Sequence, residues 1–235
     1  MTLKLNLGAG HVLFPLSRDE PLPYHAHLEP LPDTCFEPGW VNVDHANLPG
    51  IGEQVNLFRL PWIRSSNGSP WNDSSVDEIY AGHIVEHIPH SVRPSDGMPL
   101  AWVKNAHTAC ERYDGFFVWF AEVWRVLRPG GLIYIRCPYG ASPAALADPT
   151  HTRYIVPGSF SYLGKHGQPA PFDYEIPFEF EQAEPLLLRF THKYAERLTE
   201  MSDEERTEAP FKFMDSVDEL RIVLRAVKPN PNGSG

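Results

Sequence analysis

The sequence predicts an α/β fold in which helices or long loops connect the strands of a mostly parallel sheet. Short apolar runs alternate with longer segments up to residue 138, an arrangement typical of parallel sheets. Between two of these runs, residues 115–127 carry apolar side chains at helical spacing, and the "RPGG" that follows ends the helix. Two late segments, residues 178–190 and 220–228, are expected to close the sheet as an antiparallel pair.

The expected parallel strands are the apolar runs themselves. They are residues 3–10, which end in glycines, 39–46, 53–62, 76–81 and 132–138. Between the two late segments, the polar residues 192–208 are expected to be helical and to face solvent.

Length and composition indicate a single folded unit. The chain has 235 residues, so we expect one domain over residues 1–228 and a disordered tail over 229–235. No apolar run approaches the roughly 20 residues needed to span a bilayer, and no signal peptide is evident, so a cytoplasmic location and no membrane partner are expected. A net charge of −10 makes nucleic acid an unlikely partner. Three widely spaced cysteines indicate neither a disulfide framework nor a Cys-based zinc site.

Proline-rich segments interrupt the α/β pattern. Much of the proline falls within residues 11–40, where we expect a long loop and a possible lid in place of the first crossover helix. Tyr24, His25 and His27 would then lie near a substrate. Residues 139–180 are expected to form an insertion on the substrate side of the sheet.

Four ordered segments carry a resemblance to a known family. "LNLGAG", "VNVDHA", "VDEIYAGHIVEHIP" and "AEVWRVLRPGGLIYIRCP" occur in the order and near the spacing of class I S-adenosylmethionine-dependent methyltransferases. The sequence most resembles the small bacterial and phage-type members, over residues 3–138. The resemblance implies a Rossmann-like sheet, mostly parallel with an antiparallel C-terminal pair, and S-adenosyl-L-methionine as the cofactor.

The resemblance also implies a set of cofactor-binding residues. Gly8 and Gly10 lack a Cβ, which lets a ligand lie against the backbone. Asp44 corresponds to the acid that accepts hydrogen bonds from the two ribose hydroxyls, and Asn56 replaces the usual aspartate beside the adenine. The full expected set is Leu7, Gly8, Ala9, Gly10, Asp44, Asn56, Leu57 and His83.

The segment "HIVEHIP" also contains His-x-x-Glu-His, the inverted zincin pattern. That site needs both histidines and the glutamate on one helix, with a further ligand from elsewhere. Gly82 and Pro89 leave room for only about one and a half turns, so we interpret the pattern as coincidental and expect no metal. Glu86 and His87 are expected to hold the local turn or to pair with each other.

The candidate catalytic residues are His83, His151 and Arg153. In the family, the segment of His83 ends beside the cofactor sulfonium. Histidine side chains titrate near neutral pH, so His151 is a candidate to remove a proton from an acceptor, and Arg153 suits a carboxylate or phosphate. The alternative is structural: Asp148 caps a turn and Arg153 bridges to it.

These observations favour a methyltransferase that acts on a small-molecule or glycan acceptor. The alternative from another class is a binding or assembly protein that keeps the fold without the reaction, which the missing first helix motivates. A nucleic-acid methyltransferase and a zinc hydrolase built on the His83 segment are the remaining alternatives. The sequence does not indicate the oligomeric state.

Overall fold

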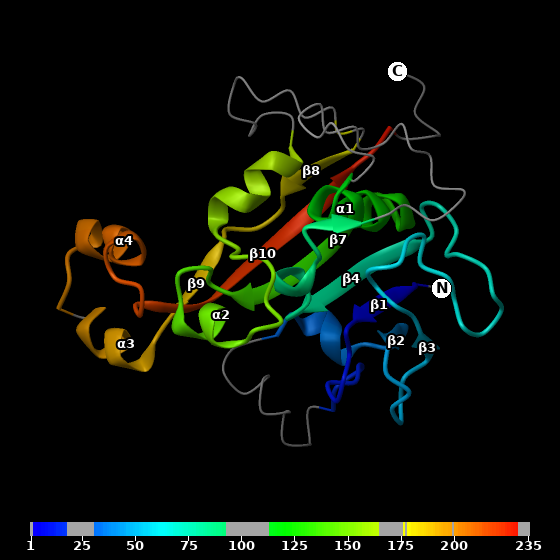
Figure 1. The fold of residues 1–235 in the computed structure, drawn as a ribbon, viewed down its shortest axis with the longest axis horizontal. Helices are drawn as coiled ribbons and strands as arrows, with labels where there is room; N and C mark the ends of the chain where they lie inside the picture. Colours follow the sequence, from blue (N-terminus) through cyan, green and yellow to red (C-terminus); the bar gives the residue numbers. More distant parts are fainter. Residues whose placement is uncertain are drawn as a thin grey trace.

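An eight-stranded mixed sheet forms the centre of the fold in the computed structural model, which describes residues 2–17, 31–92, 113–164, 176, 178–198 and 200–229. The strand order is β3-β2-β1-β4-β7-β10-β8, with β9 also paired to β10 (Figure 1). The parallel strands are β1 (Lys4–Leu7), β2 (Trp40–Asp44), β3 (Glu53–Gln54), β4 (Val76–Gly82) and β7 (Leu127–Pro138). The expected α/β sheet is confirmed, although the third strand is only two residues long.

The direction of strand order reverses at β1. The chain passes from β1 to β2 on one side and later returns to β4 on the other, so Leu7 pairs with both Val43 and Ala81. In open α/β sheets, ligands bind beyond the carboxyl ends of the strands at such a switch point. The segments that follow β1 and β4 are therefore the place to look for a site.

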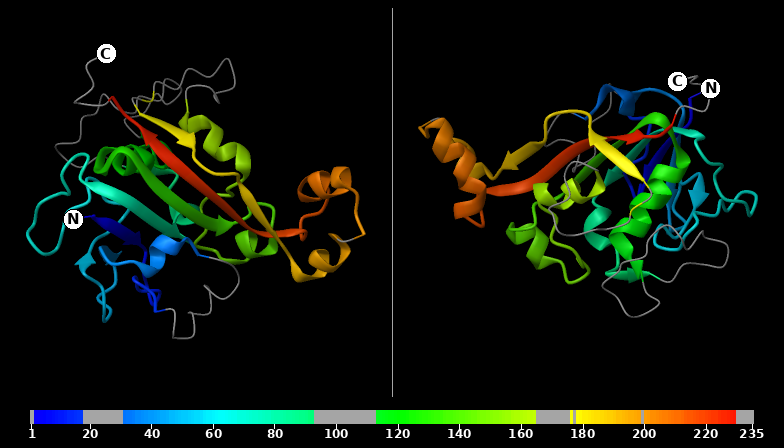
Figure 2. Two further views of the ribbon diagram at one scale, coloured as in Figure 1. Left: turned by 180° about the vertical axis from the view of Figure 1, so that it is seen from behind. Right: turned by 90° about the horizontal axis from the view of Figure 1, so that it is seen from above.

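One face of the sheet is apolar and is covered by α1 (Gly115–Val126), which lies beside β7 in all three views (Figures 1 and 2). The Asp114 carboxylate caps the helix by accepting a hydrogen bond from the Phe116 amide. The sequence predicts one apolar stripe, but most side chains of α1 are buried. The rings of Trp62 and Trp119 are 5.8 Å apart, so the segment after β3 packs against the helix.

The other face is largely polar where β1 meets its neighbours. Asn6 lies opposite Asn42 of β2 and Tyr80 of β4. The Asn6 amide donates to the Val12 carbonyl at 2.7 Å, and the Asn42 amide exchanges hydrogen bonds with both backbone groups of Phe14. These side-chain bonds satisfy backbone groups of Val12 and Phe14 that would otherwise be paired within a helix.

The expected loop in place of the first crossover helix is confirmed within residues 11–17 and 31–39. The single helical turn there is the 3-10 helix η1 (Asp33–Phe36). Tyr24, His25 and His27 lie outside the described residues.

The antiparallel C-terminal strands are also confirmed. β10 (Val217–Val227) pairs with β7, with β8 (Glu179–Gln182) and with β9 (Leu187–Phe190). The polar segment forms two helices, α3 (His192–Leu198) and α4 (Asp203–Lys212), beyond the end of the sheet (Figures 1 and 2).

The remaining elements are short. They are η2 (Val85–His87), β5 (Ser91–Val92), which pairs with β6 (Tyr113–Asp114), α2 (Pro143–Ala147) and η4 (Pro157–Leu163). Cys35 and Cys137 are buried free thiols. Within the described residues, no helix is long and apolar enough to cross a membrane.

Phe120→Ala tests the apolar face. Phe120 is fully buried and contacts the rings of Phe116, Trp119 and Phe180, so the substitution leaves a cavity and is expected to lower the free energy of unfolding by about 3–5 kcal/mol. Urea denaturation measures the change. Met214→Ala, at a side chain that is 61% exposed, is the control and should change it by less than about 0.5 kcal/mol. Equal losses of unfolding free energy in Phe120→Ala and Met214→Ala would contradict the assignment of Phe120 to the core.

Candidate functional site

The turn after β1 is built by two glycines in left-handed conformations. Gly8 has φ +64° and Gly10 has φ +49°, which residues with a Cβ rarely adopt. A Cβ on Gly8 would also lie 2.1 Å from Cδ1 of Ile84. The expected tight, bare turn is therefore present at the switch point.

The Asp44 carboxylate, at the end of β2, holds this turn in place. Its Oδ2 accepts a hydrogen bond from the Gly10 amide and its Oδ1 from the Ala46 amide, both at 2.9 Å. His45 Nδ1 lies 3.0 Å from Oδ1. Because an ionised carboxylate offers about four acceptor positions, Asp44 can hold the turn and still accept from a ligand.

Two neighbouring cavities open around this turn and share Gly8, His83 and His87. The first has a volume of about 500 Å³ and includes Asp44, Asn56 and Leu57 in its lining. The second, of about 430 Å³, is lined in part by Ala9, Gly10, Arg136, Asp148 and His151. Both volumes lie within the range of small-molecule sites, about 300–1,000 Å³.

These cavities bring together seven of the eight residues that the sequence predicts to bind the cofactor. The exception is Leu7, whose side chain is in the hydrophobic core. The Asn56 side chain accepts a hydrogen bond from the Phe58 amide at 3.0 Å, which fixes the turn after β3.

His83 links the two cavities. It follows β4 with φ +57°, an uncommon conformation for a residue with a Cβ. Its Nδ1 lies 3.3 Å from Oε1 of Glu86, and its Nε2 lies 3.4 Å from Oε2 of Glu219. Burial alone would lower the pKa of His83, but the two carboxylates outweigh it and raise the pKa to about 9.

Glu219, on β10, is the centre of a buried ionic cluster. It accepts hydrogen bonds from Arg136 at 2.8 and 3.1 Å and from Arg221 at 2.8 Å, besides its contact with His83. Burial opposes ionisation, yet these cationic groups hold the pKa of Glu219 well below its usual range. This cluster is not among the residues predicted from the sequence; the signal for it is the charged residues within the apolar strand segment "DELRIVLRAV".

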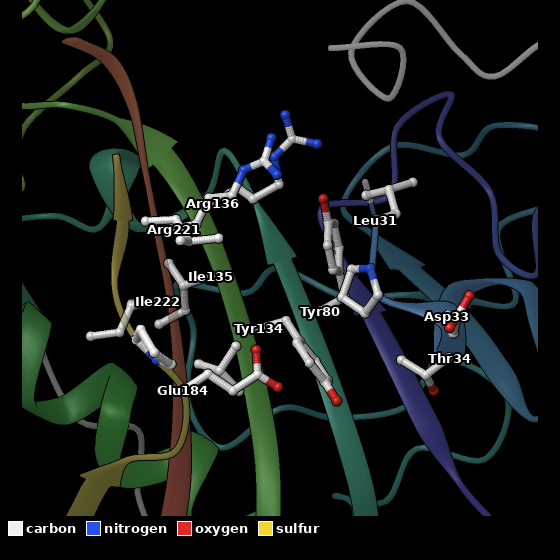
Figure 3. Close-up of a pocket in the computed structure, with 14 residues that line it drawn as sticks. Leu31, Asp33, Thr34, Tyr80, Tyr134, Ile135, Arg136, Glu184, Arg221 and Ile222 are labelled. Atoms are coloured by element: carbon white, nitrogen blue, oxygen red, sulfur yellow. The ribbon is translucent and has the colours of Figure 1, made fainter. Parts of the chain in front are cut away.

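A third cavity, of about 380 Å³, lies on the polar face of the sheet beside this cluster. In Figure 3 the Arg136 and Arg221 side chains lie close together at one end, and Tyr134 and Glu184 point away from them. Tyr80 and Arg136 also line the 430 Å³ cavity, so the two spaces adjoin.

The segment of residues 148–153 packs against the turn that follows β4. The backbone amides of Thr152 and Arg153 donate to the Glu86 carbonyl at 2.9 and 3.0 Å. The Arg153 guanidinium donates to the carbonyls of Ile88 and Pro89, both at 2.8 Å. These contacts fix the loop and place His151 in the cavity wall.

The candidate catalytic residues are thus only partly brought together. His83 and His151 both line the 430 Å³ cavity, and Arg153 does not. Arg153 pairs with Asp114 at 3.3 Å rather than with Asp148, so the expected Arg153–Asp148 bridge is wrong in its partner. Asp148 does hold its own turn, because its Oδ1 accepts from Thr150. Of the two alternatives for Glu86 and His87, pairing with each other is wrong: Glu86 pairs with His83 within the same turn, and His87 Nδ1 lies 3.3 Å from the Thr150 carbonyl oxygen.

Comparison with solved structures places this architecture among known folds. A SAM-dependent methyltransferase from Archaeoglobus fulgidus superposes with a TM-score of 0.50, covering 95% of this chain and 86% of that chain at 15% identity. The chain has the Rossmann-like class I methyltransferase fold.

Two further solved structures match with lower TM-scores. The YcgJ protein from Bacillus subtilis has a TM-score of 0.47 at 14% identity, covering 97% of this chain and 93% of that chain. A putative sarcosine dimethylglycine methyltransferase from Galdieria sulphuraria has a TM-score of 0.46 at 14% identity, covering 95% and 78%. No protein-family model and no curated protein sequence matches this chain.

Glu219→Gln tests the ionic cluster. Removing one partner from a buried ionic group leaves the others uncompensated, so the free energy of unfolding at pH 7 should fall by about 3–5 kcal/mol. The pKa of Glu219 is depressed in the folded protein, so its stabilisation is present above the ordinary glutamate pKa of about 4.3 and is lost as the pH falls below it. Urea titrations from pH 7 to pH 3 should show that the difference in free energy of unfolding between the wild type and Glu219→Gln becomes smaller as the pH falls.

The control for this experiment is Glu181→Gln. Glu181 is half-exposed and pairs with Arg225 on the surface, so its substitution should cost less than about 1 kcal/mol at every pH. If the difference in free energy of unfolding between the wild type and Glu219→Gln did not change with pH, the ionised state of Glu219 would be contradicted.

Proposed function

We propose that the protein is an S-adenosylmethionine-dependent methyltransferase that acts on a small-molecule or glycan acceptor. The observation that carries this proposal is the pair of cavities at the switch point, where the bare turn of Gly8 and Gly10 meets the carboxylate of Asp44. The class I methyltransferase fold supports the same activity.

The 500 Å³ cavity suits the adenosyl part of the cofactor. The Asp44 carboxylate has acceptor capacity for two ribose hydroxyls, and Asn56 and Leu57 border the space that an adenine would occupy. When bound, S-adenosylmethionine supplies an electrophilic methyl group on a sulfonium sulfur, which leaves as the neutral thioether. Gly8 and His83, shared by both cavities, mark the junction where that methyl group would face the acceptor.

The 430 Å³ cavity then holds the acceptor. Its wall contains ionisable side chains from separate segments, including His11, Glu86, Arg136 and Asp148. A polar acceptor can hydrogen-bond to such a wall, whereas an apolar one would leave these groups unpaired. The residues contribute by holding the acceptor in line and excluding water, so the transfer does not require a strong base.

A binding or assembly protein remains the second candidate function. Residues 11–17 continue from the glycine turn as an extended segment held by Asn6 and Asn42, without an α-helix. The pocket therefore lacks the aligned amides of a helix N-terminus, which commonly help to bind ligands in such folds.

Binding of S-adenosylhomocysteine, the demethylated product, separates the two functions. A ligand at 100 times its dissociation constant stabilises the folded state by about 2.7 kcal/mol, which corresponds to a rise in Tm of roughly 5–10 °C for a chain of this size. Asp44→Ala should abolish the shift because it removes both the ribose acceptor and the bond to Gly10. Differential scanning fluorimetry with the wild type and the variant measures both effects.

Asp203→Ala is the matched control. Its side chain is fully exposed in the first turn of α4, so the ligand-induced shift should equal that of the wild type. No shift in the wild type at millimolar ligand would contradict the methyltransferase proposal and favour the binding protein.

A further inference from the structure

Three metal-binding side chains converge in the wall of the 430 Å³ cavity. Glu86 and His87 come from the turn after β4, and His151 comes from the loop after β7. One ligand atom from each lies within 4.8 Å of those of the other two. The imidazole rings of His87 and His151 are 4.8 Å apart and nearly perpendicular.

Both histidines are oriented by the backbone through one nitrogen. His151 Nδ1 lies 2.9 Å from the Ala145 carbonyl oxygen, and His87 Nδ1 lies 3.3 Å from that of Thr150. His87 Nδ1 also lies 3.2 Å from the Thr150 hydroxyl oxygen. Because a carbonyl only accepts, a neutral imidazole that bonds to it donates from Nδ1 and leaves Nε2 free to bind a metal. Metal-binding histidines are commonly held by a hydrogen bond from the other ring nitrogen in this way.

The Glu86 carboxylate provides independent evidence for a ligand. The residue is 1% exposed, and no hydrogen-bond donor among the described residues reaches its Oε2. The His83 ion pair, at 3.3 Å from Oε1, compensates the charge in part but leaves acceptor capacity on the carboxylate. Burying a carboxylate with so few partners is costly unless another group binds it.

We propose that Glu86, His87 and His151 bind a divalent first-row transition metal. Two imidazole nitrogens and one carboxylate oxygen form a common ligand set for Zn²⁺ and Fe²⁺, which leave further coordination positions open. Mg²⁺ is disfavoured because it prefers oxygen ligands. The Asp148 carboxylate, with Oδ2 3.8 Å from His151 Nε2, provides a further oxygen beside the proposed ion.

This site differs from the zincin pattern in the sequence. In that pattern His83 and His87 would be the two imidazole ligands, whereas here His83 faces Glu86 and Glu219. The second imidazole comes from His151, which the His-x-x-Glu-His motif does not contain. The sequence predicts no metal site, whereas the proposed site combines residues that only the fold brings together.

A metal here has a consequence that depends on the proposed function. The ion would lie in the acceptor cavity, where an acceptor hydroxyl bound to it loses its proton more readily. His151 then acts as a ligand rather than as a proton acceptor. The coordination site itself does not depend on methyl transfer, so the two proposals can fail separately.

Metal titration of the full, tag-free chain tests the site. After removal of metals with EDTA and dialysis, calorimetry with Zn²⁺ should show one site per chain, and Co²⁺ should give visible absorption bands. His87→Ala and His151→Ala should each weaken Zn²⁺ binding by more than about tenfold, the lower limit seen for loss of an outer partner. Glu86→Gln should do the same, and a tenfold excess of Mg²⁺ should not compete.

His192→Ala is the matched control, because that imidazole is 93% exposed on α3 and its loss should leave the affinity unchanged. Equal Zn²⁺ affinity in the wild type, His87→Ala and His151→Ala would overturn the site, as would an affinity no tighter than millimolar in the wild type. Binding of S-adenosylhomocysteine, measured on the same samples, reports on the methyltransferase proposal separately.

Discussion

The hydrogen bond from the Gly10 amide to the Asp44 carboxylate, 2.9 Å long, is the interaction on which the site depends. Glycine gives the turn after β1 its left-handed conformations but does nothing to hold them. Asp44 supplies that constraint from the neighbouring parallel strand, and Ala46 fixes the same carboxylate from the other side. Sheet pairing and site geometry are therefore coupled: a shift of β2 relative to β1 would move the acid, the turn and both cavities together.

The two faces of the sheet explain the unusual connection after the glycine turn. On the apolar face, α1 and the aromatic side chains around Phe120 supply the core. On the polar face, Asn6 and Asn42 hold an extended chain by side-chain hydrogen bonds instead of packing a helix. That face retains a cavity beside Tyr80 and Arg136, which adjoins the proposed acceptor space. The extended chain of residues 11–17 thus leaves additional polar room next to the site.

The fold was largely predictable from sequence, because strands buried in a parallel sheet are short apolar runs and α1 has a helical period. The resemblance to a known family also pointed to Gly8, Gly10 and Asp44, which the structure brings together. The contacts between segments that are distant in the chain could not be predicted from the sequence. Nothing in the sequence indicates that His151 would lie against His87, since that depends on the 148–153 loop binding the turn after β4. Nor does the sequence indicate that Arg153 would fix this loop through the carbonyls of Ile88 and Pro89; its expected role toward a substrate stays a prediction.

The most direct test of the central claim is a crystal structure of the protein with S-adenosylhomocysteine. We expect the ribose hydroxyls to donate to Asp44, the adenine to lie against Asn56 and Leu57, and the sulfur to face the cavity beside His83. An adenosyl group bound elsewhere, or a glycine turn closed over these cavities with the ligand excluded at saturating concentration, would contradict the account.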